Sequence, residues 1–158
     1  MPKEVVDVNA CCLECIDELG GKQKEGVELQ WVPSPDAPVI QTVGACMKRV
    51  LTLLLDNAGK FTEKGVTRLQ CEEDKENNII RFIIEDTGIG IAPQDLPRIF
   101  EKGYTGCNGR TDKKASGLGL YLCKRICKNL GIGISITSEI GDGTCVYLSL
   151  DQYPLKAE

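Results

Sequence analysis

A carboxylate on a glycine-rich turn is the feature of this sequence best suited to bind a ligand. Asp86 ends the apolar stretch 79–85, and residues 86–92 read Asp-Thr-Gly-Ile-Gly-Ile-Ala. Glycine has no side chain, so a flat ligand could approach the backbone closely at Gly88 and Gly90. An ionised aspartate only accepts hydrogen bonds, and the exocyclic amine of adenine is a donor where guanine carries a carbonyl. Asp86 therefore predicts selection of adenine over guanine.

A second candidate segment lies upstream, at residues 53–62, which read Leu-Leu-Leu-Asp-Asn-Ala-Gly-Lys-Phe-Thr. Its apolar residues recur at helical spacing, while Asn57, Lys60 and Phe61 form an adjacent stripe. One face of this helix is expected to pack on the core while the other meets a ligand.

Two further glycine-containing segments lie downstream. Residues 116–120, Ser-Gly-Leu-Gly-Leu, open a helical pattern that runs from 118 to 130. The free amides and the positive dipole end of such a helix attract phosphate, although no Gly-Lys-Ser/Thr follows and the segment is no Walker P-loop. Residues 141–144, Gly-Asp-Gly-Thr, form a turn between two predicted strands and bring Thr144 to its end.

The elements that must position these residues follow from hydrophobic periodicity. Helices are predicted over residues 8–19, 47–61 and 118–130, and strands over 27–32, 39–41, 66–71, 78–85, 132–138 and 144–150. Helices that gather on one face of a mixed sheet give an α/β two-layer sandwich, an α+β arrangement. We expect one domain over residues 1–151, with 152–158 as a loose tail.

Composition excludes several classes of function. The chain has 158 residues and a formal net charge of -4, which fits one domain and argues against nucleic acid or an anionic membrane as a partner. No apolar run approaches a membrane span, and the first residues do not resemble a signal peptide. We therefore expect a cytoplasmic domain without direct membrane contact, whether or not a parent protein is membrane anchored.

Nine cysteines are present, and histidine is absent. Cys12 and Cys15 form a Cys-x-x-Cys pair, but no second pair stands at metal-binding spacing. Most of the cysteines fall on predicted helix or strand faces. The simpler interpretation is a set of reduced, buried thiols that pack as small hydrophobic residues.

Taken together and in this order, the four segments resemble the catalytic ATP-binding domain of bacterial sensor histidine kinases, a branch of the GHKL ATPases. The resemblance covers nearly the whole chain. It implies the Bergerat ATP-binding fold, ATP or ADP and Mg²⁺ as ligands, and a transferase activity in two-component signal transduction.

The resemblance also implies a role for individual residues. Asn57 matches the magnesium-binding position, Lys60 a lysine directed at the phosphates and Phe61 the aromatic that covers adenine. Thr144 matches the threonine that, with a bound water, completes the hydrogen bonds around the Asp86 carboxylate. The full set expected to contact the nucleotide is Asn57, Lys60, Phe61, Asp86, Gly88, Gly90, Ile91, Ser116, Gly117, Leu118, Gly119 and Thr144.

The polar segment 101–114 has no apolar period and is expected to form a mobile lid, hinged at Phe100. The family often carries an arginine in this region, near Thr105 here. Lys102 or Arg110 could supply the missing cation to the terminal phosphate, and the sequence does not choose between them. Asn57, Lys60, Lys102 and Arg110 are thus the candidate catalytic residues.

One position departs from the family pattern in a way that bears on mechanism. Leu53 stands where the family commonly has a polar residue, one helical turn before Asn57, and its side chain is expected to point toward the magnesium and the terminal phosphate. Leucine cannot activate water, which argues against the ATPase switches of topoisomerases and mismatch-repair proteins.

A chain without histidine cannot hold the phosphoacceptor of a histidine kinase. The resemblance therefore implies transfer to a histidine on a dimerisation domain of the same kinase, in cis or in trans, and then to a response regulator. The domain alone should not autophosphorylate. Three alternatives stay open, namely a nucleotide-binding module without transfer, a GHKL ATPase switch and a serine-directed anti-sigma kinase.

Overall fold

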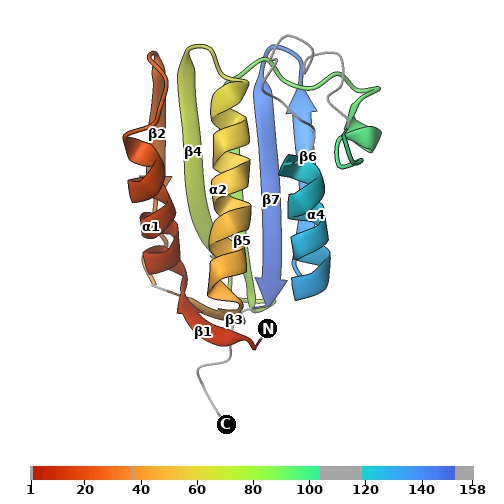
Figure 1. Cartoon of the computed structure of the whole chain (residues 1–158). Coiled ribbons are helices and arrows are strands. Elements are labelled where there is room, and N and C mark those ends of the chain that lie inside the picture. Colours follow the sequence, from red (N-terminus) through yellow and green to blue (C-terminus); the bar gives the residue numbers. More distant parts are fainter. Residues whose placement is uncertain (1, 37, 104–118, 152–158) are drawn as a thin grey trace.

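A computed structural model describes residues 2–36, 38–103 and 119–151 and has two layers (Figure 1). The three α-helices of the described residues cover one face of a sheet, as the α/β two-layer interpretation predicts. The helices are α1 (Val8–Gly20), α2 (Gly44–Lys60) and α4 (Gly119–Leu130), and the 3₁₀ helix η1 spans Leu96–Arg98. The predicted mixed sheet with helices on one face is confirmed.

The main sheet has five strands in the order β2-β4-β5-β7-β6. Their bounds are β2 Val27–Val32, β4 Gly65–Asp74, β5 Ile79–Asp86, β6 Gly133–Glu139 and β7 Gly143–Asp151. β2 pairs in parallel with β4, and the other neighbours are antiparallel. Because β5 and β7 are antiparallel neighbours, the turn that follows β5 and the turn that precedes β7 meet at one end of the sheet.

The core lies between the helices and the inner face of the sheet. On α2, Met47, Val50, Leu51, Leu54 and Ala58 are buried, as their helical spacing predicts. Alternate strand residues pack beneath them, because successive side chains of a strand point to opposite faces. The buried apolar residues of the three central strands are Leu69 and Cys71 of β4, Ile80, Phe82 and Ile84 of β5, and Val146 and Leu148 of β7.

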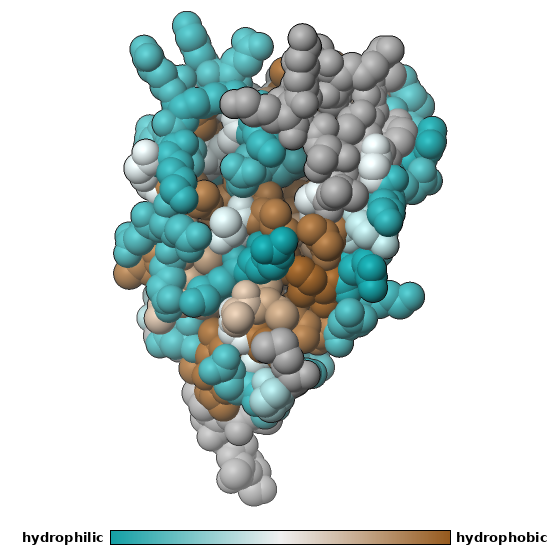
Figure 2. Space-filling view, viewed as in Figure 1, coloured by the Kyte–Doolittle hydropathy of each residue, from teal (hydrophilic) through white to brown (hydrophobic). Residues whose placement is uncertain are grey.

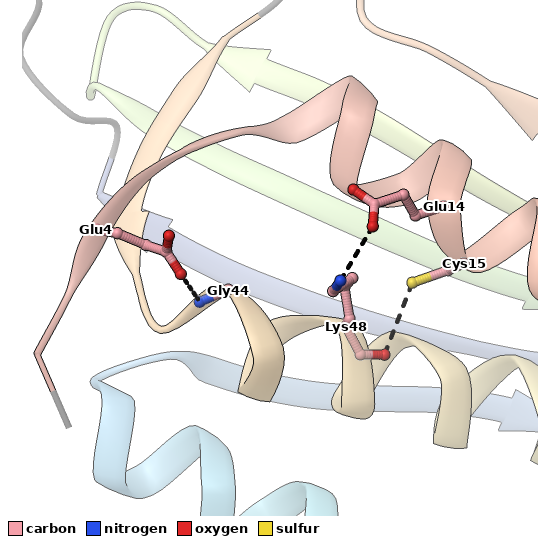
Figure 3. A network of polar contacts seen from close by, with 5 residues as sticks. All are labelled: Glu4, Glu14, Cys15, Gly44 and Lys48. Carbon is pink, nitrogen blue, oxygen red and sulfur yellow. Dashed lines mark hydrogen bonds and ion pairs between the residues drawn. The ribbon is translucent and has the colours of Figure 1, made fainter.

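A small second sheet was not predicted in full. Strand β3 (Val39–Thr42) matches the expected strand at 39–41, but it pairs with β1 (Glu4–Asp7) in a separate antiparallel ribbon. The Glu4 carboxylate accepts a hydrogen bond of 3.1 Å from the backbone N–H of Gly44, at the start of α2 (Figure 3). This bond ties the ribbon to the helix that carries the candidate ligand stripe.

The contacts between α1 and α2 involve a cysteine and an ion pair (Figure 3). The Cys15 thiol donates a hydrogen bond to the Lys48 carbonyl at 3.7 Å, and Lys48 Nζ lies 3.0 Å from the Glu14 carboxylate. All eight described cysteines are free, and six of them are buried. Burial raises the pKa of Cys71 and Cys123 to about 12. Such thiols stay protonated at neutral pH and pack as apolar side chains.

Within the described ranges, no helix is both long and apolar enough to cross a lipid bilayer.

Candidate functional site

A cavity that is partly open to solvent lies between α2, α4 and the end of the sheet. Figure 2 shows the helix-covered face, where polar side chains surround a strip of apolar ones. The lining residues are Leu54, Asn57, Ala58, Phe61, Ile84, Asp86, Gly90, Ile91, Asp95, Ile99, Leu120, Ile136, Thr144 and Val146. The cavity thus combines apolar walls with a few polar groups.

The Asp86 carboxylate is the charged group that β5 presents to this cavity. Burial raises its pKa, while hydrogen bonds from the backbone N–H groups of Gly88 and Thr144 lower it. The Gly88 N–H donates to Oδ1 at 2.9 Å. Asp86 therefore has backbone donors on the protein side and is poised to accept from a ligand on the cavity side.

Hydroxyl groups stand on the strands beside Asp86. Thr144 of β7 and Thr67 of β4 both pair with Asp86 in the strand register, so their side chains share its face of the sheet. Thr67 is 1% exposed, and its hydroxyl has no hydrogen-bond partner among the described residues. Thr144 also lines the cavity, as the sequence predicts. Two hydroxyl groups from the neighbouring strands thus flank the carboxylate. Their proximity follows from strand pairing and could not be predicted from spacing in the sequence alone.

The glycines near Asp86 make room for protein backbone, and Gly90 also lines the cavity. The expected close approach of a flat ligand to this turn stays a prediction. A Cβ atom at Gly88 would lie 2.2 Å from the Phe61 carbonyl oxygen, and one at Gly90 would lie 2.2 Å from the Glu139 carbonyl oxygen. Gly90 also has a φ of 79°. These glycines let the turn after β5 pack against the end of α2 and the β6–β7 hairpin.

Helix α2 contributes its expected stripe only in part. Asn57 and Phe61 line the cavity, and so do Leu54 and Ala58. The described lining does not include Lys60, whose Nζ lies 3.4 Å from the Asp56 carboxylate in an exposed ion pair. Because exposed ion pairs are weak, this contact does not hold Lys60 away from an incoming phosphate.

Leu53 is half-buried and packs against the hydrophobic core, and the described cavity lining does not include it. The stripe facing the cavity runs through Leu54, Asn57, Ala58 and Phe61. Leu53 lies one helical turn before Asn57, at the edge of this stripe, so its expected direction toward a magnesium ion and a terminal phosphate stays a prediction.

The segment after η1 is described as far as Gly103. Phe100 lies under a cation, with Lys124 Nζ 5.4 Å from its ring centre. Lys102 Nζ lies 5.9 Å from the ring centre of Tyr121, and the described cavity lining does not include Lys102. This candidate cation therefore contacts an aromatic ring of α4 in the present structure.

The remaining expected contacts fall largely beyond what the structure describes. Arg110, Ser116, Gly117 and Leu118 lie outside the described residues, as does most of the expected lid. Gly119 is the first described residue of α4. The choice between Lys102 and Arg110 as the cation for a terminal phosphate thus stays a prediction.

Several lining residues were missed by sequence reasoning. Asp95 is only 4% exposed and follows a turn in which its N–H donates to the Ala92 carbonyl at 2.9 Å. Ile99, Leu120 and Ile136 add apolar walls from three separate elements. Leu120 lies in the predicted helix 118–130 and Ile136 in the predicted strand 132–138, and these predictions did not indicate a cavity. For Asp95 no sequence signal separates it from an ordinary turn residue.

Comparisons with known proteins bear on this site. A family model described as histidine kinase-, DNA gyrase B-, and HSP90-like ATPase matches residues 43–154. The sensor protein SrrB of Staphylococcus aureus is 40% identical over 106 residues, which are 66% of this chain and 18% of SrrB. The matched region is therefore less than a fifth of that relative's length.

Solved structures match over almost the entire chain. Full-length ShkA in complex with AMPPNP gives a TM-score of 0.82 at 26% identity, over 98% of this chain and 32% of ShkA. The catalytic domain of the histidine kinase ThkA gives 0.81 at 20% identity, over 98% and 100%. The mycobacterial sensor histidine kinase MprB gives 0.81 at 20% identity, over 97% and 99%. The structural similarity to ThkA and MprB shows that this chain shares their fold.

Proposed function

Because the chain belongs to the family of histidine kinase-, DNA gyrase B- and HSP90-like ATPases, we propose that it binds Mg-ATP and donates the γ-phosphoryl group to a histidine. That histidine would lie on a separate dimerisation and phosphoacceptor domain of a two-component sensor kinase. The observation that carries the proposal is the half-buried Asp86 carboxylate in an otherwise largely apolar cavity. Such a group recognises a ligand that is flat and presents a hydrogen-bond donor.

Adenine fits this cavity chemically. The base would place its exocyclic amine toward Asp86 and its faces against apolar walls such as Ile91 and Phe61. Guanine would present a carbonyl oxygen to the same carboxylate, leaving two acceptors opposed in a buried site. That arrangement costs about 2 kcal/mol or more, because neither acceptor would find a donor.

Magnesium would be held largely by the nucleotide itself. Mg²⁺ takes one or two protein oxygens and keeps phosphates and waters as its other ligands, so a single amide oxygen is enough on the protein side. Asn57 lines the cavity and can supply that oxygen. In the chemistry of phosphoryl transfer, the metal neutralises charge on the phosphates. Lys60, one turn further along α2 and exposed, can approach the same charges.

The acceptor must come from another domain. The chain contains no histidine, so the phosphoryl group would pass to an imidazole of the same kinase in cis or of its partner in trans, and then to a response regulator. Phosphoryl transfer depends on positioning and charge stabilisation more than on a strong base. The apolar placement of Leu53 is therefore compatible with transfer, whereas an ATPase switch needs a water-activating group there.

The proposal is tested by incubating the chain with γ-labelled ATP and Mg²⁺, with and without a histidine-bearing dimerisation domain. The chain alone should acquire no acid-labile phosphate, and label should appear on the added domain. Replacing the acceptor histidine with glutamine is the matched control and should abolish the label. Nucleotide binding without any transfer would favour the binding-module alternative, and acid-stable label on serine would favour the anti-sigma alternative.

A further inference from the structure

One hydroxyl group outside the predicted site connects three parts of the cavity wall. Ser138 of β6 pairs with Thr144 of β7, and Thr144 pairs with Asp86 of β5. The three side chains therefore form a row across adjacent strands on the helix-covered face of the sheet. In the sequence, Ser138 reads as an ordinary polar residue near the end of a predicted strand.

The hydrogen bonds of Ser138 fix the direction of its proton. Its Oγ accepts from the Ile91 N–H at 2.8 Å and lies 2.8 Å from the Gly143 carbonyl oxygen. A carbonyl only accepts, so the single Ser138 proton goes to Gly143. The Thr144 hydroxyl lies 2.8 Å from the same Oγ. Since Ser138 has no second proton, Thr144 must donate its own proton to Ser138.

This arrangement decides what Thr144 can offer a ligand. With its proton directed at Ser138, the Thr144 oxygen keeps only lone pairs for the cavity. Asp86 beside it is likewise an acceptor when ionised. The two groups together form an acceptor-only edge that suits an amine and opposes a carbonyl.

We propose that Ser138 is a specificity-determining positioning residue, which makes the cavity select adenine over guanine nucleotides by holding the hydroxyl proton of Thr144. The inference rests on the proposed function, because it assigns a base to the same cavity. Without Ser138, the Thr144 hydroxyl could rotate and donate to a guanine carbonyl. Ser138 also accepts the hydrogen bond of the Ile91 N–H, so its loss should weaken the binding of every nucleotide somewhat. The ratio of the affinities for ADP and GDP isolates the effect on specificity.

The test measures the dissociation constants of Mg-ADP and Mg-GDP by calorimetry for the wild type and for Ser138→Ala. We expect the preference for ADP to fall about tenfold in the variant, the size of one hydrogen-bond mismatch. Ser138→Thr keeps the hydroxyl and should keep the preference. Ser135→Ala, an exposed serine on the same strand, is the matched control and should leave both constants unchanged.

A double-variant cycle separates this role from a structural one. Thr144→Val removes the acceptor, so adding Ser138→Ala to it should not lower the preference further, whereas independent effects would add. An unchanged preference in folded Ser138→Ala would overturn the inference, as would a lost preference in Ser138→Thr. If Ser138→Ala does not fold, the ratio of the Mg-ADP and Mg-GDP dissociation constants is measured for Ser138→Cys and Ser138→Thr instead. A wild type that binds neither nucleotide would instead contradict the proposed function.

Discussion

Replacing Asp86 with asparagine is expected to remove most nucleotide affinity while making the nucleotide-free domain more stable. Asparagine turns an amine toward the amine of adenine, and two buried donors that face each other cost about 2 kcal/mol, or roughly 30-fold in affinity. Burial raises the pKa of Asp86, which means that the folded cavity disfavours the charged form. A neutral side chain avoids that cost.

The sign of the pH dependence follows from the raised pKa. Above the ordinary aspartate pKa of 3.8, the unfolded chain releases the Asp86 proton more readily than the folded chain does. The penalty on the folded wild type therefore grows as pH rises toward the folded pKa and is constant above it. The stability advantage of Asp86→Asn should be largest at neutral pH and should vanish as pH falls below 3.8.

Denaturant unfolding at pH 7 and at acid pH, together with calorimetry of ADP binding, checks both halves of this expectation. Asp142→Asn, an exposed aspartate on the β6–β7 turn, is the matched control and should change neither quantity. Wild-type ADP affinity in Asp86→Asn would remove the assignment of Asp86 to adenine. A large loss of stability at neutral pH would show that Asp86 is chiefly a structural residue.

Gly143→Ala is expected to be the most destabilising single methyl addition near the site. A Cβ atom there would lie 2.0 Å from the Asp86 carbonyl oxygen and 3.0 Å from the Thr87 Cα, both parts of the backbone. Such atoms move only if β5 and β7 separate where Asp86 pairs with Thr144. The steric overlap and the left-handed backbone conformation, with a φ of 94°, should together lower the free energy of unfolding by about 3–4 kcal/mol.

Gly141→Ala supplies the matched comparison two residues away. Gly141 has a φ of 89°, and a Cβ atom there would meet nothing within 4 Å. Only the backbone strain remains, so the expected cost is about 1–2 kcal/mol. Chemical denaturation of both variants checks the difference. Equal losses would mean that backbone conformation, and not the contact with Asp86, accounts for the glycine at position 143.

The sequence predicts the layers of this fold well because hydrophobic periodicity reports which face of an element is buried. The α2 stripe and the antiparallel pair of β4 and β5 follow directly from such patterns. The pairing of β1 with β3 does not, because four-residue strands carry little periodic signal and their partners are distant in the chain.

The roles of Asn57, Phe61 and Thr144 were indicated by the resemblance to sensor kinase domains, because an isolated amide, aromatic ring or hydroxyl has several possible uses. The structure places all three with Asp86 in the lining of one cavity, and their contact with a nucleotide stays a prediction. Spacing along the helix could not show that Leu53 packs against the core, because that contact depends on tertiary structure. Ser138 was missed because its role depends on three hydrogen bonds to other strands and loops. The strand register that brings these partners together cannot be inferred from the residues around Ser138 in the sequence.

Calorimetry of the wild-type domain with Mg-ATP and Mg-GTP decides whether the cavity beside Asp86 binds an adenine nucleotide. We expect Mg-ATP to bind and Mg-GTP to bind at least about tenfold more weakly, because guanine would place a carbonyl oxygen against the half-buried Asp86 carboxylate. Removing Mg²⁺ with a chelator should weaken the binding of ATP if Asn57 shares a metal ion with the phosphates. Equal affinity for the two nucleotides, or no binding of either, would show that the cavity is not an adenine site.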